Sequence, residues 1–196
     1  MDMIIEIAGT LIGLVYLWQE YRASIYLWIT SIIMPAIYLY IYYNAGLYAD
    51  FGINVYYLVV AIYGWFAWRY NFSLTGKKDK SSPLLINYTP LRKWMALAVI
   101  FVIAWILIAW ILVNYTDSTV PYIDAFTTSL SIVGMYMLAR KYIEQWWLWL
   151  VVDVASCGLY IYKGLYFTAA LYAVYAIIAI FGYRNWRSIM NTQEKQ

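Results

Sequence analysis

The sequence contains no histidine and a single cysteine, Cys157, among its 196 residues. Without histidine or a cysteine cluster the common zinc sites cannot form, and one thiol cannot make an internal disulfide. The same two absences disfavour a membrane enzyme, which needs a nucleophile with a base or a bound metal ion. We therefore expect no metal, no cofactor and no catalytic residue.

Charged residues are also scarce. Asp, Glu, Lys and Arg make up 12% of the chain, whereas hydrophobic residues make up 65% and aromatic residues 21%. An ordinary soluble domain is about 45–50% apolar and about 25% charged. Because a chain of this length has no interior large enough for so many apolar side chains, the composition predicts an all-α polytopic membrane protein.

Seven apolar runs of about 20 residues predict seven transmembrane helices. The runs are Met3–Trp18, Ser24–Tyr43, Tyr48–Trp68, Trp94–Val113, Tyr122–Leu138, Trp146–Tyr162 and Leu165–Phe181. A polar segment between the third and fourth runs divides the chain. The predicted parts are a first three-helix bundle (1–70), a cytoplasmic loop (71–93), a linker helix (94–114), a second three-helix bundle (115–187) and a cytoplasmic tail (188–196).

The basic residues predict the orientation of the chain in the membrane. With the N-terminus outside and the C-terminus in the cytoplasm, every Lys and Arg except Lys163 falls on the cytoplasmic side. Cytoplasmic loops of membrane proteins carry such an excess of basic residues. The chain is therefore expected to lie in a bacterial inner membrane with its N-terminus outside.

The first three apolar runs resemble the last three. The shared residues are Gly13, Tyr21 and Trp28, which align with Gly134, Tyr142 and Trp149 at an offset of 121, and Gly64, which aligns with Gly182 at an offset of 118 after a short indel. One helix between the two triplets makes them enter the membrane from the same side. The pattern predicts a parallel 3+1+3 repeat, an arrangement that places a substrate site between the repeats of a transporter. Chance similarity between Tyr- and Leu-rich helices is the alternative.

Asp153 is the leading candidate for a functional residue, because it is a carboxylate inside the sixth apolar run. A carboxylate at the centre of a bilayer costs about 2.5–3.5 kcal/mol on insertion scales. Trp146 and Trp149 precede it by seven and four residues, so the three side chains follow one helical stripe. Indole rings beside an anion suit a flat organic cation. The alternatives are a structural hydrogen bond for the acid and packing roles for the indoles.

Four further residues are candidates for substrate binding. Glu144 and Gln145 lie at the cytoplasmic start of the sixth run, where an acid is also favourable simply because it faces a helix N-terminus. Asn54 and Tyr57 are the polar candidates in the third run. For Asn54 the alternative is a hydrogen bond between helices.

Asp124 and Thr128 belong to a polar stripe on one face of the fifth run. We expect this stripe to line an outer vestibule, where Asp124 would attract a cation. The alternative is a helix cap together with hydroxyl groups that bond to the preceding turn.

The segment Glu144-x-Trp146-x-x-Trp149-x-x-x-Asp153 and the run 158–166 after it resemble the PnuC family of vitamin transporters. The fold of that family is SWEET-like, with seven transmembrane helices in the 3+1+3 arrangement. The resemblance covers nearly the whole chain. It implies facilitated diffusion of nicotinamide riboside, thiamine or riboflavin, with trapping of the vitamin by intracellular phosphorylation. It also implies a homotrimer and an indirect link to a cytosolic vitamin kinase.

An acid after the tryptophan pair resembles the thiamine branch, PnuT, whereas the nicotinamide riboside branch carries Asn near position 153. We therefore expect thiamine as the substrate, taken up by facilitated diffusion. Two alternatives remain open for a transporter: nicotinamide riboside, which is also a cation, and proton-coupled vitamin uptake through Asp153. A membrane scaffold or sensor is the alternative outside transport.

Overall fold

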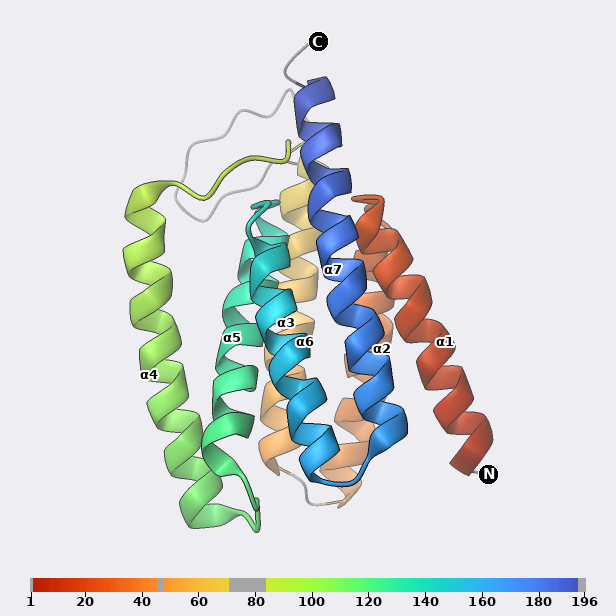
Figure 1. The fold of residues 1–196 in the computed structure, drawn as a ribbon, viewed down its shortest axis with the longest axis vertical. Helices are drawn as coiled ribbons and strands as arrows, with labels where there is room; N and C mark the ends of the chain where they lie inside the picture. The colour runs from red at the N-terminus through yellow and green to blue at the C-terminus, as the bar shows by residue number, and fades with distance from the viewer. Residues whose placement is uncertain (1, 46–47, 71–83, 194–196) are drawn as a thin grey trace. The chain divides into compact units, whose positions relative to one another are not determined.

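The computed structural model describes residues 2–45, 48–70 and 84–193. Seven α-helices account for most of this described part (Figure 1). They are α1 (Asp2–Tyr21), α2 (Leu27–Ala45), α3 (Tyr48–Tyr70), α4 (Leu91–Tyr115), α5 (Pro121–Ala139), α6 (Gln145–Tyr162) and α7 (Tyr166–Gln193). The chain divides into two compact units, Met1–Leu85 and Ile86–Gln196, so that α1–α3 belong to the first and α4–α7 to the second.

The predicted all-α fold is confirmed, and the helices differ from the apolar runs mainly at their ends. Helix α1 continues to Tyr21, past the expected end at Trp18. Helix α7 continues to Gln193, twelve residues past Phe181, because Trp186 and Met190 in this extension are buried. Most of the predicted cytoplasmic loop, residues 71–83, lies outside the described residues.

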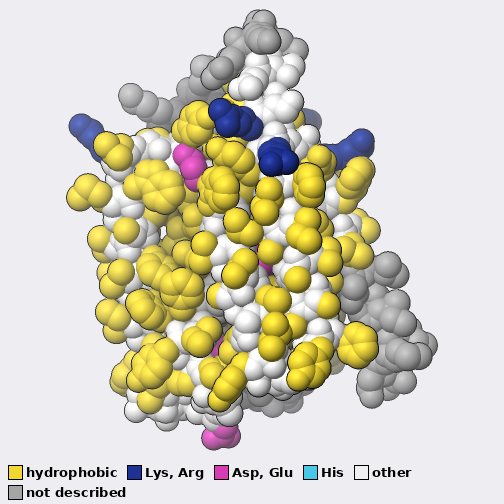
Figure 2. Space-filling model, in the orientation of Figure 1, with side chains coloured by type: hydrophobic (Ala, Val, Ile, Leu, Met, Phe, Trp, Pro, Cys, Tyr) yellow, Lys and Arg dark blue, Asp and Glu magenta, His cyan; other side chains and the backbone are white. Residues whose placement is uncertain are grey.

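Three helical stretches among the described residues are long and apolar enough to cross a membrane: Phe51–Tyr70, Leu91–Tyr115 and Tyr166–Gln193. Helix α4 is the most apolar, with a mean hydropathy of 3.0, and most of its side chains are exposed. The face shown in Figure 2 is covered mainly by hydrophobic side chains. An apolar exposed surface of this kind fits lipid as its solvent.

In the first unit, α2 packs along α3 and α1 lies against α2. The contact between α2 and α3 is centred on Trp28, which is fully buried and meets Trp68 edge to face with ring centroids 5.5 Å apart. Gly64 lies directly beneath the indole, where a Cβ would overlap the ring of Trp28. A glycine is therefore needed at this crossing.

In the second unit, α5 packs between α4 and α6, and α6 packs along α7. The α5–α6 turn has the same backbone as the α1–α2 turn of the first unit. Ala23 and Lys141 have φ angles of 50° and 52°. Their amides donate to the carbonyl groups of Glu20 and Leu138, at 2.9 Å in both cases.

These turn positions differ by 118 residues, as do the first residues of α2 and α6 and of α3 and α7. The offset of 121 expected for the first helices is therefore wrong, because the two turns have equal length and no indel separates them. The parallel arrangement of the two triplets stays a prediction.

Candidate functional site

The candidate site is built on α6. Its side chains Gln145, Trp149 and Asp153 are spaced by four residues and lie on one stripe, about 12 Å long at 1.5 Å per residue. Gln145 and Asp153 are buried, at 0% and 7% exposure, and Trp149 is half-buried. The ring of Trp149 lies against Gly134 of α5, 3.4 Å from where a Cβ would be. The stripe thus faces protein along its whole length.

Asp153 interacts electrostatically with two tyrosines and forms no ion pair with a described basic residue. Its charge acts on the hydroxyl groups of Tyr172 and Tyr175, both on α7. Tyr172 also stacks on Tyr160 of α6, with ring centroids 5.2 Å apart. The carboxylate has no hydrogen bond or ion pair with any described residue. A buried anion without a counter-charge is costly, so a cationic ligand beside it would be stabilised.

Gln145 and Trp149 present polar atoms with no partner in the part of the chain that the structure describes. Both amide atoms of the Gln145 side chain and the Nε1 of Trp149 are buried and make no hydrogen bond there. Each buried polar group left unsatisfied costs about 1–3 kcal/mol. A ligand whose donor and acceptor groups reached such atoms would be stabilised by them.

Trp146 points to a different neighbour from Trp149. It is 1% exposed and meets Trp186 of α7 edge to face, with ring centroids 5.7 Å apart and an interplanar angle of 88°. A Cβ at Gly182 would come within 2.5 Å of its ring. This is the geometry of Trp28, Trp68 and Gly64 in the first unit, so Trp146, not Trp149, is the counterpart of Trp28.

The match with Trp28 gives Trp146 a packing role between α6 and α7. Its own Nε1 is buried without a hydrogen bond to any described residue, and its predicted role in substrate binding stays a prediction. At a spacing of four residues, Trp149 and Asp153 share their stripe with Gln145, whereas Trp146 also contacts α7.

Replacing Gly182 with alanine is expected to destabilise the protein, because the new methyl group collides with the ring of Trp146. Overpacking of this kind typically costs about 1–3 kcal/mol. We expect a lower midpoint of thermal unfolding in detergent. The matched control is Gly158→Ala on α6, where nothing lies within 4 Å of the added Cβ. Equal midpoints for the two variants would contradict the packing role of Trp146.

Glu144 is engaged outside the stripe. Its carboxylate accepts hydrogen bonds from the backbone N–H of Thr89, at 3.0 and 3.2 Å, and from the Thr89 hydroxyl at 2.9 Å. Next to this contact, Asn87 pairs with the α5–α6 turn by accepting from the amide of Ile143 at 3.0 Å. These bonds tie the segment before α4 to the start of α6. They favour a structural role for Glu144, and its predicted role in binding stays a prediction.

Asp124 and Thr128 lie on α5, and both are half-buried. Asp124 accepts a hydrogen bond from the Ser118 hydroxyl at 2.8 Å and forms an ion pair with Lys163 at 3.6 Å. The neighbouring Thr127 hydroxyl donates to backbone carbonyl groups one turn earlier, as the capping alternative expected. Asp124 therefore already has a counter-charge, and its predicted attraction for a cation stays a prediction.

Asn54 and Tyr57 lie half-buried on α3, in the first unit. The ring of Tyr57 lies 5.7 Å from that of Tyr56. Tyr57 also acts electrostatically on Tyr16 of α1, whose hydroxyl is hydrogen-bonded to Glu20. Tyr57 is therefore within electrostatic range of a polar side chain of α1.

Sequence reasoning missed several polar residues in the two units. Glu20 is a second buried acid, at 1% exposure, and was placed outside the first apolar run because that run was ended at Trp18. Tyr172 and Tyr175 lie beside Asp153. The signal for Tyr175 was present in the sequence, because it falls 118 residues after Tyr57.

Comparison with known proteins agrees with this architecture. The family model described as "Nicotinamide mononucleotide transporter" matches residues 3–188. The chain is 26% identical over 206 residues to the nicotinamide riboside transporter PnuC of Escherichia coli (strain K12), covering 93% of this chain and 84% of that one. It is 24% identical over 182 residues to the riboflavin/roseoflavin transporter RibM of Streptomyces davaonensis, covering 92% and 83%.

The fold is also similar to a crystal structure of the vitamin B3 transporter PnuC, with a TM-score of 0.67 and 22% identity over 93% of this chain and 80% of the other. The helices, the apolar surface and these matches define a multi-pass membrane transporter of vitamins. The chain belongs to the nicotinamide mononucleotide transporter family, the PnuC family that the tryptophan–acid segment resembles.

Proposed function

We propose that this protein carries nicotinamide riboside across the bacterial inner membrane by facilitated diffusion. The observation that supports a cationic vitamin as the substrate is Asp153, a buried carboxylate without a basic partner among the described residues, on the same helical stripe as Trp149. The names of the relatives add to it, because they refer to nicotinamide riboside or to riboflavin and not to thiamine. The expected thiamine specificity has no such support and becomes the second candidate.

The chemistry of nicotinamide riboside matches the stripe on α6. Its pyridinium ring is a flat cation that can stack on Trp149, a contact worth about 0.5–2 kcal/mol. Asp153 would neutralise the ring charge, and the carboxamide of the ligand would exchange hydrogen bonds with the buried amide of Gln145. Ribose hydroxyl groups would meet the phenol groups of Tyr172 and Tyr175. Neutral riboflavin gives the acid no comparable use.

Thiamine is the second candidate because of one residue. Asp153 stands where the nicotinamide riboside branch is expected to carry Asn, and thiamine also combines a cationic ring with a hydrogen-bonding ring. Both vitamins fit an acid beside an indole, so charge alone does not separate them. An experiment in which the two vitamins compete for one site would separate them.

The transport cycle follows from the proposed parallel 3+1+3 repeat. Rocking of the two triplets around a site near the midplane would open it to either side in turn. The N-terminus would lie outside and the C-terminus in the cytoplasm. No energy source is needed, since phosphorylation by a cytosolic vitamin kinase would hold the product inside the cell. A homotrimer is the proposed assembly.

Uptake of labelled nicotinamide riboside into proteoliposomes tests the function. Without any ion gradient the label is expected to equilibrate across the membrane, and unlabelled nicotinamide riboside should compete better than thiamine. Saturable thiamine uptake that nicotinamide riboside does not inhibit would reverse the choice of substrate. Accumulation above equilibrium only under a pH gradient would replace facilitated diffusion by proton coupling.

A further inference from the structure

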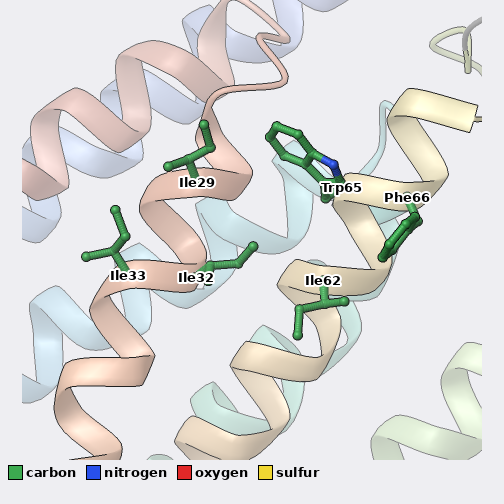
Figure 3. A pocket seen from close by; sticks show the side chains of 6 residues that line it. All are labelled: Ile29, Ile32, Ile33, Ile62, Trp65 and Phe66. Atoms are coloured by element: carbon green, nitrogen blue, oxygen red, sulfur yellow. The ribbon is translucent and has the colours of Figure 1, made fainter.

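An apolar groove of about 360 Å³ runs between α2 and α3 of the first unit (Figure 3). Its lining residues are Ile29, Ile32, Ile33, Ile62, Trp65 and Phe66. The three isoleucines of α2 form one side and the three residues of α3 form the other. The groove contains almost no polar surface, so a hydrocarbon chain is the kind of occupant that it suits.

One end of the groove carries a positive charge. Arg69 follows Trp65 and Phe66 by four and three residues and therefore lies on the same face of α3. Its side chain is exposed and makes no hydrogen bond or ion pair with any residue that the structure describes. Tyr70 stacks on Phe66 at 6.1 Å. Aromatic rings and an arginine at a helix end are typical of the boundary between lipid tails and headgroups.

We propose that this groove binds one anionic phospholipid, with an acyl chain along the isoleucines and the headgroup phosphate on Arg69. The proposed topology places the Arg69 end of α3 at the cytoplasmic face. The lipids of that leaflet include anionic ones, and they are attracted to basic residues next to the membrane.

The second unit shows how such a groove is closed. At the positions 118 residues after Ile29 and Trp65 stand Trp147 and Tyr183, whose rings pack 4.9 Å apart. This aromatic pair fills the space that remains open in the first unit. Arg187 occupies the position equivalent to Arg69. The groove is therefore open because Ile29 is smaller than Trp147, the residue at the equivalent position of the second unit. A basic residue at the helix end is present in both units and does not by itself create a groove.

A second apolar groove provides a contrast. It lies between α4 and α5 and includes Trp110, Asn114 and Tyr122 among its lining residues. The charged residues nearest to its lining along the chain are Asp124 and Asp117, and both are acids, which disfavour an anionic headgroup. The combination of an open apolar groove and a basic end is thus a feature of the α2–α3 site.

Native mass spectrometry of the full-length protein in detergent, titrated with phosphatidylglycerol or with phosphatidylcholine of the same acyl chains, tests the proposal. We expect the first phosphatidylglycerol to bind about fivefold more tightly than phosphatidylcholine, as one arginine at the headgroup predicts. Arg69→Gln should remove this preference. The control Arg92→Gln, at the exposed start of α4, should retain it.

Two further variants test the groove itself. Ile29→Trp copies the second unit and should weaken binding of both lipids at the first site. Trp147→Ile should open a second groove beside Arg187 and add one tightly bound phosphatidylglycerol per protomer. Unchanged lipid preference in Arg69→Gln would overturn the proposal. A change of oligomeric mass in Ile29→Trp with lipid binding intact would also overturn the proposal. The groove would then be an interface between copies of the chain.

Discussion

Replacing Asp153 with alanine is expected to reduce the initial rate of nicotinamide riboside uptake by at least about 30-fold. Removing one member of a buried charge pair typically costs about 2–5 kcal/mol, and 1.4 kcal/mol corresponds to a factor of ten. The carboxylate is 7% exposed and has no counter-charge among the described residues, so the proposed cationic ligand would supply it. The measurement is uptake of labelled vitamin into proteoliposomes at a fixed amount of inserted protein.

A loss of uptake is informative only if the variant folds. The alanine variant removes an uncompensated charge from an apolar helix, and its thermal unfolding midpoint in detergent is expected to rise or to stay the same. Asp117→Ala is the control, because this acid lies in the exposed α4–α5 segment and its loss should leave uptake unchanged. Uptake by Asp153→Ala within a few-fold of the wild type would remove Asp153 from the transport site.

Replacing Trp149 with alanine is expected to raise the dissociation constant for nicotinamide riboside by about 2- to 30-fold, the range that a cation–π contact of about 0.5–2 kcal/mol implies. Trp149→Phe should recover part of this loss, because a smaller aromatic face remains. Isothermal titration of the purified protein measures both constants without relying on tryptophan fluorescence.

The matched control for Trp149 is Trp110→Ala. Trp110 is an exposed tryptophan of α4, at 56% exposure, and its loss should leave the dissociation constant unchanged. If the alanine and phenylalanine variants of Trp149 lose the same affinity, the residue acts by a means other than ring stacking. If neither loses affinity, the indole does not contact the vitamin.

The helices and the burial of Asp153 were predictable because both depend on the local chain. Apolar runs of about 20 residues set the helix positions, and the acid lies inside such a run. The ends of α1 and α7 were not predictable in this way. Helix α7 passes the end of its apolar run because Trp186 and Met190 are buried by tertiary packing.

The roles of the two tryptophans could not be separated from the sequence. Both are on α6, three residues apart, and helical spacing alone allows either of them to share a stripe with Asp153. The difference comes from Gly182 of α7, which receives the ring of Trp146, and from Gly134 of α5, which receives that of Trp149. These contacts across 36 and 15 residues of sequence give the two indoles different neighbours.

Glu144 illustrates the same point for polar residues. Its position at the start of α6 suggested either a ligand contact or a favourable charge at the helix N-terminus. The actual partner, Thr89, is 55 residues away, in the segment before α4. No spacing rule within one helix could have predicted this contact.

The charge of Asp153 can be tested most directly with a pair of ligands that differ only in charge. Nicotinamide riboside is a cation, and its reduced dihydro form is neutral and of nearly the same shape. We expect Asp153→Asn, which keeps the size of the side chain and removes its charge, to weaken binding of the cation but not to abolish it, because the nicotinamide riboside branch is expected to carry Asn near this position. The same variant should bind the reduced form as the wild type does. An equal loss for both ligands, or no loss for either, would contradict a carboxylate that receives the positive ring.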